Sequence, residues 1–293
     1  MHVHILGICG TFMGSLALLA RELGHTVSGS DAGVYPPMST QLEEAGIALC
    51  EDYAPANLEP RPDLVVIGNA LSRGNPEVEA VLDRSLPYVS GPQWLAEQVL
   101  PERRVIAVAG THGKTTTTSL TATLLGEGGL DPTFVIGGRL TSAGTNARLG
   151  EGDYLVAEAD ESDASFLHLQ PMVSIVTNID ADHMATYGGD FEKLKSTFLE
   201  FLHNLPFYGL AILCIDDANV RGLLERVHRK FLTYGFSEDA DYRITDFAQQ
   251  GGEIRFTAHR PGGLAPLPVR LAMPGRHNAL NALAAIAVAS DVS

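Results

Sequence analysis

The sequence is poor in several residue types, and each shortage excludes a class of protein. Its 293 residues include only 3 cysteines, Cys9, Cys50 and Cys214, which form neither a disulfide framework nor a metal motif and fit a reducing compartment. Basic residues number 20 against 35 acidic ones, and a net charge of −15 argues against unaided nucleic-acid binding. No apolar run reaches the roughly 18 residues of a membrane span, and the N-terminus lacks a basic signal region. We expect a cytoplasmic protein that binds neither nucleic acid nor membrane.

Short apolar runs alternate with helical segments along most of the chain, which predicts an α/β fold with mostly parallel sheets covered on both faces. Apolar residues make up 45% of the chain, enough for a sizeable core. The length suggests about two domains. We expect them at residues 1–100 and 101–293, with a joint around residues 91–104. The last helix ends just before Ser293 without a closing element, which suggests a cut rather than a natural end.

The strongest local motif is VIAVAGTHGKTTTT at residues 105–118. A strand leads into a glycine turn, and Gly113, Lys114 and Thr115 open a helix, whose N–H groups favour an anion. Lys114 can reach the outer phosphates of a nucleotide, and the Thr115 hydroxyl can bind Mg²⁺. The full phosphate-loop pattern would need glycine where Val108 stands, so this is a shorter variant. The alternative is a glycine turn with a solvated lysine.

An acidic cluster follows the predicted strand at residues 154–157. Glu158, Asp160, Glu161 and Asp163 repel one another at the carboxyl end of a parallel strand, and Mg²⁺ would relieve that repulsion. The alternative is a solvated acidic loop.

Two further polar segments are candidates. The segment 177–183 follows a buried strand and ends in His183, which is either a ligand of a second metal, an orienting group or a structural histidine. Asn278 and Asn281 lie three residues apart on one helix face, where their amides either read an adenine edge or cap the helix.

The N-terminal turn, Gly7 to Gly14, matches a dinucleotide fingerprint only loosely, because glycines are missing at Cys9 and Phe12. Its geometry suits any nucleotide diphosphate, with Asp31 facing a ribose. A NAD-dependent dehydrogenase is therefore a remoter alternative.

Taken together, these motifs resemble the Mur ligases, the ATP-dependent amide-forming enzymes of peptidoglycan precursor synthesis. GTHGKTTTT is similar to the family's ATP loop, and PGRHNALNALAA to its adenine-side helix. EADESDASFLHLQPM and TNIDADHMATYGGDFEKLK are similar to the UDP-N-acetylmuramate–L-alanine ligases. HILGICGTFMGSLALLARELGHTVSGSD and VIGNALSRGNPEVE are similar instead to the murein tripeptide ligases.

The resemblance implies a Rossmann-like UDP-sugar-binding domain, a central ATPase domain and a third, C-terminal acceptor domain for which this chain has no residues. It implies ATP and Mg²⁺ as cofactors and an acyl phosphate formed on the lactyl carboxylate of UDP-N-acetylmuramate. The expected acceptor is L-alanine, and the alternative is L-Ala-γ-D-Glu-meso-diaminopimelate. Because the acceptor domain is missing, we expect the chain alone to bind UDP-N-acetylmuramate without completing the ligation. A non-catalytic module that only binds the UDP-sugar is a further alternative.

Roles follow residue by residue. Lys114, Glu158 and His183 are implied as catalytic, and Thr115, Glu158 and His183 as metal ligands. The implied ATP contacts are Gly110, Thr111, His112, Gly113, Lys114, Thr115, Thr116, His277, Asn278 and Asn281. The implied UDP-sugar contacts are Gly10, Thr11, Asp31, Ser72, Arg73, Asp160, Ser162 and Asp163.

Overall fold

The computed structural model describes residues 1–140, 144–160, 169–182 and 184–292. It consists of two compact units. Unit 1 contains Met1–Arg103 and Thr133–Glu151, and unit 2 contains Arg104–Pro132 and Gly152–Ser293. The division therefore differs from the expected one at residues 133–151, which group with unit 1 although their sequence lies inside the expected second domain.

Unit 1 is built on a five-stranded parallel sheet with the order β3-β2-β1-β4-β5. Its strands are β1 (His2–Leu6), β2 (Thr26–Asp31), β3 (Ala48–Glu51), β4 (Leu64–Ile67) and β5 (Tyr88–Ser90). Its helices are α1 (Thr11–Glu22), α2 (Met38–Glu44), α3 (Pro76–Asp83) and α4 (Gly91–Gln98), with a 3-10 turn η1 at Pro55–Leu58. The strand order reverses between β1 and β4, and ligands of such sheets bind at the carboxyl ends of the strands at that point.

A hairpin completes unit 1. Strands β7 (Thr133–Leu140) and β8 (Thr145–Arg148) pair antiparallel, and both contact α1. The hairpin covers a helix that is buried along most of its length, from Met13 to Ala20.

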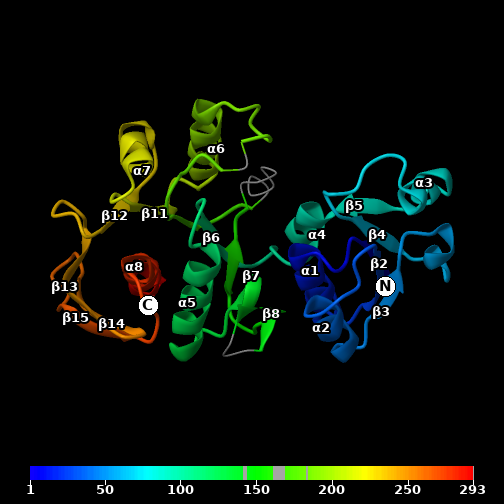
Figure 1. Cartoon of the computed structure of the whole chain (residues 1–293), viewed down its shortest axis with the longest axis horizontal. Coiled ribbons are helices and arrows are strands. Elements are labelled where there is room, and N and C mark those ends of the chain that lie inside the picture. The colour runs from blue at the N-terminus through cyan, green and yellow to red at the C-terminus, as the bar shows by residue number, and fades with distance from the viewer. Residues whose placement is uncertain (141–143, 161–168, 183, 293) are drawn as a thin grey trace. The chain divides into compact units, whose positions relative to one another are not determined.

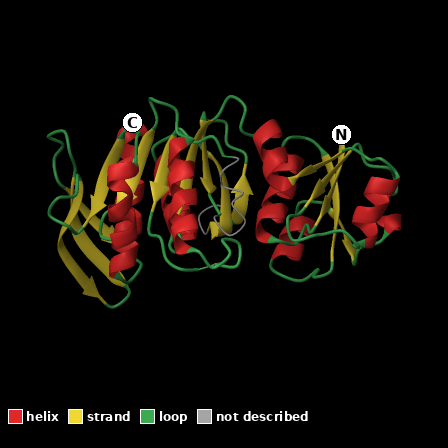
Figure 2. Cartoon of the chain, turned by 90° about the horizontal axis from the view of Figure 1, so that it is seen from above, coloured by secondary structure: helices red, strands yellow, loops and turns green. Residues whose placement is uncertain are grey.

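Unit 2 contains a larger sheet in which β15-β14-β13-β12-β11-β10-β6-β9 are neighbours. Its parallel strands are β6 (Arg104–Ala109), β9 (Tyr154–Glu158), β10 (Val173–Val176), β11 (Leu210–Cys214) and β12 (Phe231–Gly235). After β12 come β13 (Tyr242–Gln250), β14 (Glu253–His259) and β15 (Leu267–Leu271), which form an antiparallel meander. Figure 2 shows this meander curling beside the last helix.

Helices cover both faces of this sheet, as the continuous apolar runs of its central strands require. Helices α5 (Lys114–Glu127) and α8 (Arg276–Val292) lie side by side on one face (Figure 1). On the other face are α6 (Phe191–His203), α7 (Ala218–Leu223) and the 3-10 turn η3 (Leu224–Arg226). Small side chains let α5 and α8 approach closely: α5 buries three threonines and one alanine, and α8 is rich in buried alanines.

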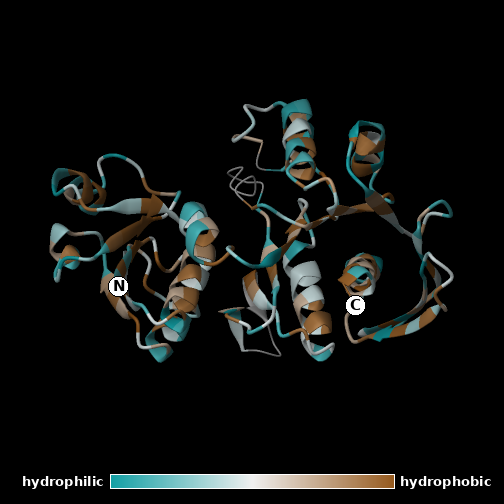
Figure 3. Ribbon diagram, turned by 180° about the vertical axis from the view of Figure 1, so that it is seen from behind, coloured by the Kyte–Doolittle hydropathy of each residue, from teal (hydrophilic) through white to brown (hydrophobic). Residues whose placement is uncertain are grey.

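The central strands of both sheets are strongly hydrophobic, whereas exposed loops and the outer side of α6 are hydrophilic (Figure 3). No helix within the described part of the chain is long and apolar enough to cross a membrane. The expected α/β class, with a Rossmann-like first domain and a parallel sheet in the second, is confirmed.

Candidate functional site

The carboxyl ends of three adjacent strands carry the predicted chemistry of unit 2. Strand β6 lies between β9 and β10, and the register places Ala109 opposite Val176 and Val108 opposite Glu158. The three loops that follow therefore begin at the same edge of the sheet, which is where ligands of parallel sheets bind.

The turn after β6 depends on two glycines. Gly110 has a φ of +135°, and a Cβ there would lie 2.0 Å from the Thr177 hydroxyl oxygen. Gly113 has a φ of +85°, and a Cβ there would lie 2.7 Å from the Asn281 amide oxygen. The chain can make this tight turn, packed between the loop after β10 and helix α8, only because both positions lack a side chain.

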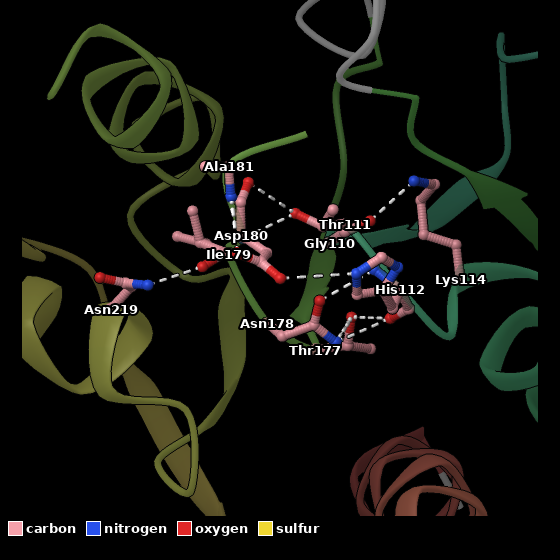
Figure 4. Close-up of polar contacts among 10 residues, drawn as sticks. All are labelled: Gly110, Thr111, His112, Lys114, Thr177, Asn178, Ile179, Asp180, Ala181 and Asn219. Carbon is pink, nitrogen blue, oxygen red and sulfur yellow. Dashed lines mark hydrogen bonds and ion pairs between the residues drawn. The ribbon is translucent and has the colours of Figure 1, made fainter. Parts of the chain in front are cut away.

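The loop after β10 holds the turn in place (Figure 4). The Thr111 N–H donates to the Asn178 carbonyl at 3.1 Å, and the His112 N–H donates to the Asn178 side-chain oxygen at 2.8 Å. The Asn178 amide and the Thr177 hydroxyl both donate to the His112 carbonyl, at 2.8 and 2.7 Å. Two N–H groups of the turn are thus committed to Asn178, so an anion would be held by the N–H groups at the start of α5.

The loop after β10 is itself braced from both sides. The Asp180 N–H donates to the Thr111 hydroxyl at 2.9 Å, and the Asn219 amide donates to the Ile179 carbonyl at 2.7 Å (Figure 4). Asn219 comes from α7, so a helix on the opposite face of the sheet helps to fix the turn.

The cationic and acidic candidates lie beside this turn. The Lys114 ammonium donates to the Gly110 carbonyl at 2.7 Å, so the side chain folds back over the turn. The Thr115 hydroxyl donates to the Glu158 carboxylate at 2.7 Å. A hydroxyl and a carboxylate in contact are two hard oxygen ligands, which suits Mg²⁺.

The start of α5 differs from that of four other helices in the described structure. Side chains of Asn75, Ser90, Asp190 and Asp217 accept hydrogen bonds from the first turns of α3, α4, α6 and α7. Helices α1 and α5 begin instead at Gly10 and Gly113, and among the described residues no side chain caps either one. The first N–H groups of a helix can bind an anion when a glycine turn and a cation lie beside them. At α5 that cation is Lys114.

The adenine-side candidates lie at the start of α8. Asn278 and Asn281 are buried, and the Asn281 amide donates to the Asn278 side-chain oxygen at 3.3 Å. The Asn278 amide donates to the Pro274 carbonyl at 2.6 Å. His277 is exposed and packs on Gly275, where a Cβ would lie 2.5 Å from the ring. The first turn of α8 is therefore fixed internally by the two asparagines, while the Asn281 oxygen lies against Gly113 of the phosphate turn.

Unit 1 has its own glycine turn after β1. The Asp31 carboxylate, at the end of β2, accepts from the Cys9 N–H and the Gly33 N–H, both at 2.9 Å. Gly7 has a φ of +78°, and the Gly10 N–H donates to its carbonyl at 3.1 Å. Burial, with the nearby charge of Asp31, raises the pKa of the Cys9 thiol to about 11 and keeps it neutral. Gly10 and Thr11 are exposed at the start of α1.

The loop after β4 carries Ser72 and Arg73. The Arg73 guanidinium makes two hydrogen bonds to Glu79, at 2.8 and 2.9 Å, and the Ser72 carbonyl accepts from the Asn75 N–H at 3.3 Å. This ion pair lowers the pKa of Glu79 to about 2. The register places Leu6 beside both Ser30 and Ile67, so the Gly10, Asp31 and Arg73 loops begin at one edge of the unit 1 sheet.

Three predicted site residues, Ser162, Asp163 and His183, lie outside the described residues, as does Glu161 of the acidic cluster. Asp160 is described and exposed. Within the described ranges, no three acidic, histidine or cysteine side chains gather as a metal cluster. The structure thus brings together Thr115 and Glu158 of the expected metal ligands.

Sequence reasoning missed the supporting residues of the turn. It singled out His183 in the segment 177–183, whereas Thr177, Asn178 and Asp180 make the contacts described above. Their position after a buried strand was the available signal. Nothing in the sequence pointed to Asn219.

The fold and the turn together define a class of protein: an α/β protein in which a glycine turn opens a helix at the carboxyl edge of a parallel sheet, the arrangement with which nucleotide-binding proteins hold phosphate. The chain belongs to the Mur ligase family. The Mur ligase middle domain matches residues 108–289, and the Mur ligase family catalytic domain matches residues 2–103.

Solved structures agree with this assignment. A murein peptide ligase from Psychrobacter arcticus is 40% identical with a TM-score of 0.89, over 100% of this chain and 65% of that one. The UDP-N-acetylmuramate:L-alanyl-γ-D-glutamyl-meso-diaminopimelate ligase from Neisseria meningitides is 38% identical with a TM-score of 0.89, and the match covers 100% of this chain and 94% of that one. UDP-N-acetylmuramate–alanine ligase from Thermotoga maritima is 28% identical with a TM-score of 0.87, and the match covers 100% of this chain and 65% of that one. The chain therefore spans about two thirds of the length of two of these relatives.

Proposed function

We propose that the chain provides the UDP-sugar and ATP sites of a ligase that joins an amine to the lactyl carboxylate of UDP-N-acetylmuramate. The observation that carries this proposal is the Thr115–Glu158 contact of 2.7 Å beside the Lys114 turn. Lys114 supplies a cation, and Thr115 and Glu158 supply two hard oxygen ligands, beside the start of α5, which can hold phosphate. ATP and a carboxylate substrate are both anionic, so bringing them together requires such groups.

The proposed roles divide between the two units. In unit 2, Lys114 neutralises the outer phosphates, and Gly110, Thr111, His112, Gly113 and Thr116 shape the turn. Thr115 and Glu158, with His183, would hold Mg²⁺, which when bound offsets charge on the transferring phosphoryl group. His277, Asn278 and Asn281 flank the adenine. The UDP-sugar is assigned to Gly10, Thr11, Asp31, Ser72, Arg73, Asp160, Ser162 and Asp163.

The proposed reaction has two steps. The lactyl carboxylate takes the γ-phosphoryl group of ATP and becomes an acyl phosphate, with ADP as leaving group. The amine then attacks the carbonyl carbon, phosphate leaves, and the nitrogen loses a proton as the amide forms. Positioning and charge stabilisation account for most of the catalysis in such phosphoryl transfers. The proposed place of work is the cytoplasm.

The acceptor we propose is the tripeptide L-Ala-γ-D-Glu-meso-diaminopimelate. Identity to the two murein peptide ligases is 40% and 38%, against 28% to the alanine ligase. L-alanine, the acceptor expected from the sequence, remains the second candidate because the motifs at residues 158–172 and 177–195 resemble the alanine ligases. The family match favours a ligase over the dehydrogenase alternative.

The test measures phosphate release with ATP, Mg²⁺ and UDP-N-acetylmuramate in the presence of either the tripeptide or L-alanine, with the product mass as a second readout. In an enzyme that also carries the acceptor domain, we expect amide formation with the tripeptide and little with L-alanine, whereas residues 1–293 alone should bind the UDP-sugar without forming amide. Faster reaction of that enzyme with L-alanine would reverse the acceptor assignment. UDP-sugar binding without phosphate release by that enzyme with either amine would support the non-catalytic module instead.

A further inference from the structure

The β7–β8 hairpin is bound to α1 at both ends of that helix. In the first turn, the Asn146 amide of β8 donates to the Ser15 hydroxyl at 2.8 Å and to the Thr11 carbonyl at 3.4 Å. At the last residue of α1, the Glu22 carboxylate accepts from the Leu149 N–H. The hairpin therefore fixes where α1 starts and how it is oriented within unit 1.

The contact in the first turn is a closed network inside the core. Ser15 is fully buried, and Asn146 is 2% exposed. The Ser15 hydroxyl donates to the Thr11 carbonyl at 2.8 Å while it accepts from Asn146, so it uses both of its hydrogen-bonding roles. Thr11 follows Gly10, the residue at which α1 begins without a side-chain cap in the described structure.

An amide at position 146 is costly for the fold. Its side-chain oxygen is buried and has no hydrogen-bond partner among the described residues. A buried polar atom without a partner destabilises the folded state, and an apolar side chain of similar size would avoid that cost. The energetic reason to keep an amide there is the pair of hydrogen bonds that it donates to the first turn of α1.

We propose that Asn146 is a positioning residue of the UDP-sugar site. Its amide, through Ser15 and the Thr11 carbonyl, holds the first turn of α1, so that the N–H groups that open the helix from Thr11 onward face the diphosphate in a fixed arrangement. This inference rests on the proposed function, which assigns the diphosphate of the UDP-sugar to that turn. A binding turn held rigid before the ligand arrives loses less entropy on binding, which raises affinity.

The test is calorimetric titration of UDP-N-acetylmuramate into the wild-type chain, Asn146→Leu and Ser15→Ala, with ATP affinity and thermal midpoint measured in parallel. We expect Asn146→Leu to weaken UDP-N-acetylmuramate binding about tenfold and Ser15→Ala to weaken it less. ATP affinity should stay within twofold of wild type. The thermal midpoint of Asn146→Leu should change little, because the variant also removes the unpaired oxygen.

The matched control is Thr145→Val, the neighbouring position of the same strand. The Thr145 hydroxyl donates only within β8, to the Ala147 carbonyl at 2.9 Å, so UDP-N-acetylmuramate affinity should not change. Should Asn146→Leu fail to fold, Ser15→Ala removes the same hydrogen bond from the other side. Wild-type affinity in both variants would overturn this inference alone, and so would equal losses of affinity for both nucleotides. Absence of binding to the wild-type chain would overturn the proposed function, and this inference with it.

Discussion

The two glycine turns of the molecule start alike and are held by different chemistry. Each follows a central parallel strand and opens a helix at a glycine, Gly10 in unit 1 and Gly113 in unit 2. The first is held by a carboxylate, because Asp31 accepts from two backbone N–H groups. The second is held by the neutral side chains of Thr177 and Asn178 and has Lys114 folded over it.

This difference suits the first turn to binding a phosphate group that does not react, and the second turn to binding one that is transferred. A turn braced by a negative charge and without an adjacent lysine suits a diphosphate that stays intact, gripped by backbone dipoles. A turn with a lysine and a hydroxyl–carboxylate pair suits a phosphoryl group whose charge changes during transfer.

The largest effect is expected at the lysine. Lys114→Ala removes a preorganised positive charge, and losses of this kind typically lower kcat by about 10²–10³. Phosphate release in the presence of ATP, UDP-N-acetylmuramate and the tripeptide should fall by that factor, while UDP-N-acetylmuramate affinity stays unchanged. Lys193→Ala, at an exposed lysine of α6, is the control. Near-normal turnover of Lys114→Ala would remove the lysine from the site.

The next effect is expected at the carboxylate beside it. Glu158→Gln keeps the size of the side chain and an oxygen for Thr115 but removes the charge that attracts a cation. The Mg²⁺ concentration needed for half-maximal activity should rise about tenfold, in line with the cost of losing one charged ligand group. Glu127→Gln makes the same chemical change at the far end of α5 and should leave the Mg²⁺ titration unaltered. An unchanged titration for Glu158→Gln would place the metal elsewhere.

Gly113, in the turn after β6, can be compared with a glycine that has room for a side chain. Gly113 and Gly129 have φ values of +85° and +79°, but only at Gly113 would a Cβ meet another atom closely, the Asn281 oxygen at 2.7 Å. Gly129→Ala should cost only backbone strain, about 1–2 kcal/mol of unfolding free energy. Gly113→Ala should cost more and also weaken ATP binding. Urea denaturation and ATP calorimetry measure both, and equal losses would show that the Gly113–Asn281 contact is unimportant.

The carboxylate of the first turn should have a smaller effect, confined to unit 1. In Asp31→Asn an NH₂ group replaces one of the two carboxylate oxygens that accept from the Cys9 and Gly33 N–H groups. One hydrogen bond, worth about 1–3 kcal/mol, is therefore lost. UDP-N-acetylmuramate affinity should drop about tenfold, and ATP affinity should not change. Asp63→Asn is the matched control, because Asp63 accepts from the His2 N–H at the opposite end of β1. Equal effects of both variants would argue that Asp31 acts on stability alone.

The sequence predicted the parallel strands well because their residues form continuous buried runs. The apolar run at residues 64–67 coincides with β4, and the runs at 105–109, 154–157 and 173–177 differ from β6, β9 and β10 by one residue at one end. The run at 211–215 lies one residue later than β11 at both ends. The β7–β8 hairpin was not predicted, since its strands contain glycines and polar residues and owe their place to contacts with α1, far away in the chain. Local patterns cannot show such support.

The residues of the candidate site also fall into a group that the sequence predicts and a group that depends on distant contacts. Lys114, Thr115 and Glu158 could be predicted because charged groups after buried strands must converge at one edge of a parallel sheet. Their roles remain predictions. Asn178 follows a buried strand, which was a signal for it, but Asn219 and Asn146 could not be predicted. Each of these two contributes through hydrogen bonds that exist only once distant elements meet.

The smallest effect concerns Arg73 and shows whether unit 1 adds a cation to its turn. The Arg73 guanidinium holds the pKa of Glu79 at about 2, below its ordinary value of 4.5. The pair therefore stabilises the folded state above pH 4.5, and this contribution fades as the pH falls toward 2. The side chains of Arg73 and Glu79 are 79% and 32% exposed, so solvent screening keeps this contribution to stability small.

The thermal midpoints of wild type and Glu79→Gln should differ slightly at pH 7 and converge as the pH falls below 4.5. Saturating UDP-N-acetylmuramate should shrink the difference at pH 7, because Arg73 would then bond the ligand instead of Glu79. A difference that the ligand leaves unchanged would remove Arg73 from the UDP-sugar site and leave the first turn to its backbone alone.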